Sequence, residues 1–136
     1  MKKPAPEIDG VEYDTSLPII DLEQLEMLVL VDEDDDDSHA LVRELYDLFR
    51  SESKGKLDGL ASACQSGDAP AVRKIIHFVA GSAGNLGLAR LCAFYRGIEK
   101  AIDLETISDL HLLIGPAVEE FELACEAFSA SFLPSS

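Results

Sequence analysis

Residues 68–87 read DAPAVRKIIHFVAGSAGNLG, and this stretch decides the fold class of the chain. Asp68 can cap a helix whose first turn contains Pro70, and the glycines near the far end can terminate that helix. The apolar side chains between these signals recur at helical spacing and form one stripe; they are Val72, Ile75, Ile76, Val79, Ala83 and Leu86. We therefore predict an amphipathic helix that ends at about Gly84 or Leu86.

The sequence before this stretch predicts two more helices. The spacing of leucines after Asp21 indicates a short helix that stops at the acidic run 32–37. Ser38 can then cap a long helix whose apolar face continues to Cys64, and Gly67 can terminate it. The acidic run lacks the glycine and closing glutamate of a calcium-binding loop, so we interpret it as a solvated loop.

The sequence after this stretch predicts two further helices, over about residues 88–102 and 110–132. Pro116 should kink the second of these helices or restart it. Nothing has the pattern of a β-strand, and the connections between the long helices are short. This order predicts an all-α fold, an antiparallel four-helix bundle with an additional short N-terminal helix.

Two parts are expected along the chain. Residues 1–19 contain several prolines and a glycine among polar residues, and they should form a flexible N-terminal arm. Residues 20–133 should form the bundle, because a chain of 136 residues suits one domain. The modest length and Met1 favour a free-standing protein over a segment of a larger one.

The composition excludes several classes of partner. The formal net charge of -15 would repel a nucleic-acid backbone, and no stripe of lysine or arginine offsets it, so we expect no nucleic-acid partner. No apolar run reaches the length of a membrane span, so we expect a cytoplasmic protein without a membrane partner. The widely spaced Cys64, Cys92 and Cys125 have apolar neighbours and should be reduced core residues.

One histidine does not fit the apolar stripe of the helix over residues 68–87. At about 100° per residue, His77 projects roughly 140 to 150° from the centre of that stripe and should face water. Its neighbours on the same outward face are Arg73, Lys74, Ala80, Gly81 and Gly84. Each glycine in a helix interior costs about 1 kcal/mol relative to alanine, so two on an exposed face suggest that another molecule approaches closely.

An imidazole in this position could act as a nucleophile. Imidazole side chains are largely neutral near pH 7 and keep a lone pair, and neighbouring cations would favour an incoming anionic group. These residues alone leave open the alternative of an ordinary surface histidine beside an early helix end.

The sequence His77–Leu88 resembles the signature of histidine-containing phosphotransfer (HPt) domains. In that signature the phosphorylated histidine precedes an apolar residue, a glycine, small residues and a Leu-Gly pair at fixed spacing. The matching residues are Val79, Gly81, Ser82, Ala83, Leu86 and Gly87, with Leu91, Cys92, Ile98 and Glu99 continuing the likeness. The resemblance is most specific over residues 70–100, and helix order and length extend it over residues 20–132.

The resemblance implies a histidine phosphotransfer protein of a two-component phosphorelay. His77 would accept a phosphoryl group from a receiver-domain aspartate and pass it to another receiver, so the partners would be receiver domains of response regulators or hybrid histidine kinases. Such a phosphocarrier is not a stand-alone kinase and has no ATP site, and this sequence contains no glycine-rich nucleotide loop. We expect a monomer with no cofactor or metal of its own, and Mg²⁺ on the partner receiver.

The sequence departs from the family pattern at Ala80, where many members have a lysine that is thought to contact the phosphoryl group. Another cation should then stabilise that group. Lys74 is our first choice, and Arg73 lies on nearly the same face. The alternatives are Arg90, Arg96, Lys100, and the receiver's own lysine and metal.

Small residues after the histidine are expected to support the same site. Gly81 and Gly84 would let the receiver's active-site loops close over His77. Ser82 could hydrogen-bond the neighbouring backbone or the phosphoryl group, and the alternative is a small helix-packing residue.

Other features of the sequence bear on two alternative functions. A helical adaptor that docks on a receiver or histidine kinase and inhibits it without being phosphorylated would explain Ala80. A metal-binding bundle would need inward-facing Glu and Glu-x-x-His motifs, which this sequence lacks. His39 and His111 have no metal-binding partners at a suitable spacing and should be surface residues.

Overall fold

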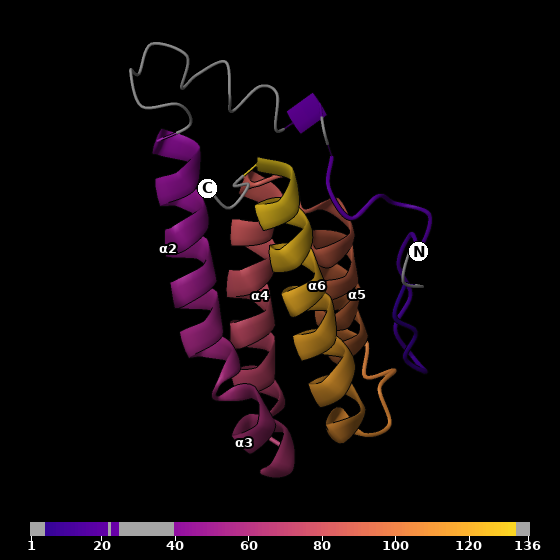
Figure 1. Ribbon diagram of the computed structural model, residues 1–136. Coiled ribbons are helices and arrows are strands. Elements are labelled where there is room, and N and C mark those ends of the chain that lie inside the picture. Colours follow the sequence, from indigo (N-terminus) through magenta and orange to yellow (C-terminus); the bar gives the residue numbers. More distant parts are fainter. Residues whose placement is uncertain (1–4, 22, 25–39, 133–136) are drawn as a thin grey trace.

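The computed structural model describes residues 5–21, 23–24 and 40–132 (Figure 1). The acidic run 32–37 and His39 lie outside these residues, and so does most of the short helix expected after Asp21.

The described residues form a helical bundle without β-strands, so the predicted fold class is confirmed. The elements are α2 (Ala40–Leu57), α3 (Leu60–Gln65), α4 (Ala69–Asn85), α5 (Ala89–Asp103), the 3-10 helix η1 (Leu110–Leu113) and α6 (Ile114–Phe132). Figure 1 shows the long helices α2, α4, α5 and α6 side by side, with the short α3 at one end of the bundle.

The long helix expected from Ser38 to Gly67 is instead broken at Asp58 and Gly59 into α2 and α3. Glycine has a low helix propensity, and here the Gly59 N–H donates to the Lys56 carbonyl in a tighter turn at 3.1 Å. The apolar face continues across the break, because Leu57, Leu60 and Cys64 are all buried. Apolar spacing alone therefore does not reveal the break.

The helix predicted over residues 68–87 is confirmed as α4. The Asp68 side chain accepts a hydrogen bond from the Ala71 N–H at 3.1 Å, and Pro70 lies in the first turn. After the last turn, Gly87 adopts a φ of 71°, a left-handed conformation that glycine takes without a steric penalty. The predicted restart at Pro116 also occurs, because α6 begins two residues earlier, directly after η1.

The core is built from aromatic and aliphatic side chains of the four long helices. Phe94, Tyr95 and Ile98 of α5 are fully buried, and the Tyr95 hydroxyl donates to the Ala117 carbonyl of α6 at 2.7 Å. The cysteines are free as expected; Cys64 and Cys125 are buried, whereas Cys92 is only partly so. Helix α4 packs extensively on α5 and also contacts α2 and α3. Solvent-facing residues of α4 and α5 therefore lie next to each other on the surface of the bundle.

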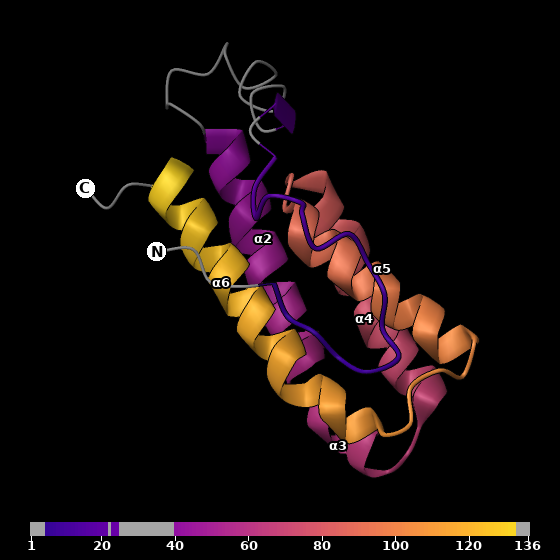
Figure 2. The same ribbon diagram turned by 90° about the vertical axis from the view of Figure 1, so that its right-hand side faces the viewer.

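The described part of the expected flexible arm packs against the bundle (Figure 2). Ile8 is buried, and the ring of Tyr13 lies 5.1 Å from that of Phe94, between centroids. Gly97 of α5 permits this contact, because a Cβ there would lie 2.7 Å from the Glu12 carbonyl oxygen. The prediction of a loose arm therefore needs correction for these residues: apolar side chains and a glycine on α5 give the segment a surface to pack on.

Hydrogen bonds hold the same segment at several points. The Thr106 hydroxyl donates to the Gly10 carbonyl at 2.7 Å, and the Arg90 N–H donates to the Pro18 carbonyl at 3.1 Å. The Asp21 N–H donates to the Gly87 carbonyl at 2.7 Å, next to the end of α4. The described N-terminal residues thus belong to the same folded unit as the helices.

Candidate functional site

Helix α4 presents His77 to solvent. Its buried face consists of Val72, Ile76, Val79, Ala80 and Ala83, all of them fully buried. His77 lies off this face, and its side chain is 60% exposed. The exposure predicted from the apolar spacing is confirmed.

Ala80 is buried, although it was expected on the outward face near His77. It lies one turn after Ile76 and directly after Val79, at the edge of the apolar stripe. Because α4 contacts α5, α2 and α3, its buried face is wider than the stripe itself and includes this position. The Cβ of a residue at position 80 therefore points into the bundle.

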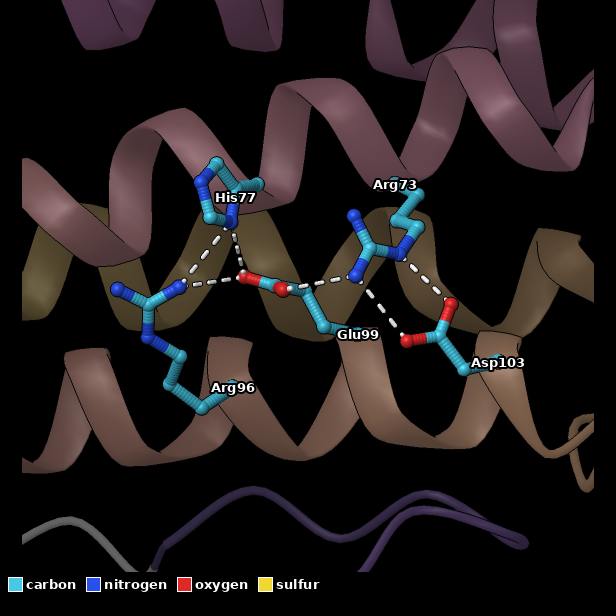
Figure 3. Close-up of polar contacts among 5 residues, drawn as sticks. All are labelled: Arg73, His77, Arg96, Glu99 and Asp103. Atoms are coloured by element: carbon cyan, nitrogen blue, oxygen red, sulfur yellow. Dashed lines mark hydrogen bonds and ion pairs between the residues drawn. The ribbon is translucent and has the colours of Figure 1, made fainter.

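Two side chains of α5 contact the ring of His77 (Figure 3). Nδ1 of His77 lies 3.0 Å from Oε1 of Glu99. The same carboxylate oxygen accepts a hydrogen bond from Nη1 of Arg96 at 2.8 Å, and this Nη1 lies 3.2 Å from Nδ1 of His77. Glu99 is buried, so a carboxylate under the surface holds an exposed imidazole and an exposed guanidinium.

These contacts decide which ring nitrogen of His77 is free to react. An ionised carboxylate only accepts hydrogen bonds, so Nδ1 carries the hydrogen and donates it to Glu99. A guanidinium only donates hydrogen bonds, so Arg96 cannot accept the hydrogen of Nδ1. Nη1 of Arg96 and Nδ1 of His77 lie close together because both donate to Oε1 of Glu99. The lone pair is then on Nε2, which points away from Glu99 in Figure 3. The nitrogen that could act as a nucleophile is therefore the one turned away from the carboxylate.

A second guanidinium lies on the other side of Glu99. Arg73 donates from Nε and Nη2 to the two carboxylate oxygens of Asp103, at 2.7 and 3.1 Å, and its Nη2 lies 3.6 Å from Oε2 of Glu99. The hydrogen bonds of this pair raise the pKa of Arg73 and lower the pKa of Asp103. Arg73 is thus held by α5 and does not contact His77.

The other predicted supporting residues of α4 are placed unequally. Lys74 is exposed and makes no hydrogen bond or ion pair with another described residue. Ser82 is half-buried. A Cβ on Gly81 would lie 3.8 Å from Nη2 of Arg96, whereas a Cβ on Gly84 would lie 3.3 Å from Sγ of Cys92. Gly81 therefore borders the site, and Gly84 allows close packing of α4 on α5.

Of the cations on α5 considered from sequence, only Arg96 contacts His77. Arg90 lies inside the bundle, where its guanidinium binds both carboxylate oxygens of Glu120 at 2.8 and 3.0 Å. Lys100 lines a small cavity with Gly10 and is exposed on the side where the N-terminal segment packs. Neither of these two cations reaches the imidazole.

Glu99 was part of the likeness to HPt domains, but the sequence reasoning gave it no role at the site. It lies four residues after Tyr95 and three before Ile102, so a carboxylate stands beside the apolar face of α5. A charged residue on the border of a buried face usually has a polar or charged partner. The position of Glu99 was therefore the sequence signal that it has one. The sequence did not show that the partner would be His77, because the contact joins two helices.

Of the other two histidines, only His111 lies among the described residues, and it is at the surface as expected. The His111 side chain is 55% exposed, and its Nδ1 lies 3.0 Å from Oδ1 of Asp109.

The described residues contain no cluster of three or more His, Cys, Asp or Glu side chains arranged to hold a metal ion. None of the described helices is both long and apolar enough to cross a membrane.

The chain and its fold are similar to known proteins. A family model described as "Hpt domain" matches residues 44–131, which include His77, Arg96 and Glu99. The structure is similar to the crystal structure of histidine-containing phosphotransfer protein B (HptB) from Pseudomonas aeruginosa PAO1. The TM-score is 0.71 and the sequence identity 27%, over 89% of this chain and 100% of that chain. No curated protein sequence matches this chain.

Proposed function

Since this chain belongs to the Hpt domain family, we propose that His77 accepts a phosphoryl group from a receiver-domain aspartate and passes it to a second receiver. The observation that carries the proposal is the orientation of the ring: Nδ1 lies 3.0 Å from Glu99, Nε2 points away from Glu99, and the side chain is 60% exposed. A ring anchored at one nitrogen and open at the other is oriented for attack on an incoming phosphorus atom.

The transfer step follows from this geometry. The Nε2 lone pair forms the bond to phosphorus while the bond between phosphorus and the aspartate oxygen breaks, and the aspartate leaves as a carboxylate. The hydrogen on Nδ1 stays in place, so the phosphorylated ring carries a positive charge. The Glu99 carboxylate stabilises that charge, and transfer to a second receiver reverses the step.

The partner receiver supplies the rest of the chemistry. A Mg²⁺ ion bound by the receiver would neutralise charge on the phosphoryl oxygens during transfer. This chain contributes the nucleophile, its orientation and an open approach beside Gly81, where α4 has no side chain. Its role is that of a phosphocarrier between two receivers.

The test is incubation with a receiver that carries a labelled phosphoryl group. Wild type should acquire a label that is lost in acid and retained in alkali, as expected of a phosphoramidate on histidine. His77→Gln should acquire none while keeping its helical circular dichroism, and His111→Gln is the matched control that should be labelled normally. Undiminished labelling of His77→Gln would refute the proposal. Tight receiver binding without any label on wild type would favour the inhibitory adaptor instead.

A further inference from the structure

The phosphoryl group on His77 needs a compensating positive charge that α4 does not supply. A phosphoryl group carries close to two negative charges near neutral pH. At position 80 the chain has a buried alanine, which offers neither charge nor hydrogen bond. Arg73 is bound through two donors to Asp103, and Lys74 makes no hydrogen bond or ion pair with a described residue, so no such contact holds it beside the imidazole. The remaining cation beside the ring is Arg96.

The guanidinium of Arg96 is anchored at one end and open at the other. Nη1 binds Oε1 of Glu99 at 2.8 Å, whereas Nη2 makes no hydrogen bond with a described residue. In Figure 3, Nη2 of Arg96 and Nε2 of His77 both point away from Glu99, toward the same side of the site. The side chain is 46% exposed, so an incoming group can reach it.

Gly81 keeps this open side free. A Cβ built on Gly81 would lie 3.8 Å from Nη2 of Arg96, so a longer side chain at this position would compete for the space beside the guanidinium. Gly81 of α4 and Arg96 of α5 therefore border the same surface, and the absence of a side chain at Gly81 leaves room beside the guanidinium.

We infer that Arg96 binds the phosphoryl group during its transfer to and from His77, in place of a cation on α4. This inference rests on the proposed function. Nη2 donates a hydrogen bond to a phosphoryl oxygen while Nη1 stays on Glu99, so the guanidinium need not leave its ion pair. Glu99 then positions both the nucleophile and the cation, and Arg96 makes or breaks no covalent bond during the transfer.

The experiment measures the rate of transfer from a phosphorylated receiver to wild type, Arg96→Ala, Arg96→Gln, Arg96→Lys and Lys100→Ala. Loss of a charge-assisted hydrogen bond in the transition state should slow Arg96→Ala and Arg96→Gln about tenfold or more. Arg96→Lys should recover part of the rate. Lys100→Ala removes the same charge from the same helix on its other side and should stay within about twofold of wild type.

The outcomes separate this inference from the proposed function. If wild type is labelled on His77 and Arg96→Ala transfers as fast as Lys100→Ala, Arg96 has no such role and the proposed function stands. If Arg96→Gln keeps the wild-type rate while Arg96→Ala is slow, the side chain only spaces Glu99 and the inferred charge role is wrong. If wild type is never labelled, the proposed function fails, and this inference fails with it. Circular dichroism of each variant verifies that the bundle is intact.

Discussion

Oε1 of Glu99 lies 3.0 Å from Nδ1 of His77, so a buried carboxylate on α5 orients an exposed imidazole on α4. The contact crosses from one helix to the other, and its geometry depends on the close packing of α4 on α5. A carboxylate at this distance favours the tautomer with the hydrogen on Nδ1, which leaves the lone pair on Nε2. The chemistry of the site therefore depends on a residue below the surface.

Glu99→Gln should slow phosphoryl transfer to His77 about tenfold or more, because a neutral amide stabilises the charged ring less than a carboxylate does. The measurement is the single-turnover transfer rate from a phosphorylated receiver. Asp103→Asn is the matched control on the same helix, because Asp103 binds Arg73 and does not contact His77. Equal rates in Glu99→Gln and Asp103→Asn would show that the Glu99 charge does not assist transfer.

Gly81→Ala and Gly84→Ala should change the free energy of unfolding by different amounts. Alanine favours a helix interior over glycine by about 1 kcal/mol, and at Gly81 the new Cβ would meet Arg96 only at an ordinary contact distance of 3.8 Å. At Gly84 it would lie 3.3 Å from Sγ of Cys92, so repacking offsets the gain. Urea denaturation should show Gly81→Ala as the more stable variant, and the reverse order would contradict these packing assignments.

Glu120→Ala should lower the free energy of unfolding by about 3 to 5 kcal/mol, because it leaves the guanidinium of Arg90 buried without its carboxylate. The side chains of this pair are 7% and 2% exposed, for Arg90 and Glu120 respectively. The measurement is chemical denaturation, with Glu119→Ala on the exposed side of α6 as the control. A loss below about 1 kcal/mol would mean that water or another group compensates the charge of Arg90.

The stability of the protein should fall as the pH rises above about 10, because burial raises the pKa of all three tyrosines. Burial raises the pKa of Tyr13 from 10.0 to about 12, so the folded state favours the neutral phenol. This contribution is complete below the unfolded pKa and is lost as the pH rises through the folded pKa. Phenolate absorbance should therefore appear at higher pH in the native protein than in the urea-unfolded chain. Coincident titration curves would contradict the burial of these rings.

The sequence predicts α4 and the exposure of His77 because both follow from spacing within one helix. Asp68, Pro70 and Gly87 mark the ends of that helix, and the apolar stripe fixes the direction of the imidazole. The resemblance to HPt domains, carried by His77, Gly81 and the residues after them, led to the proposed function. Local signals of this kind need no knowledge of how the helices pack.

Contacts between helices could not be predicted in the same way. The positions of Glu99 and Arg96 at His77 depend on the register and separation of α4 and α5, which helical spacing does not fix. The burial of Ala80 likewise depends on how many helices cover α4. The packed N-terminal segment was missed because the proline-rich composition indicates only an extended chain, while its binding surface beside Gly97 lies far along the sequence.

The most direct test of the central claim is nitrogen NMR of ¹⁵N-histidine-labelled protein after phosphorylation by a receiver. We predict that phosphorylation shifts the Nε2 resonance of His77, while Nδ1 of the same ring keeps its hydrogen and the spectrum of His111 is unchanged. A phosphoryl group on Nδ1, on another residue, or on no residue at all would contradict the assignment of Nε2 as the acceptor.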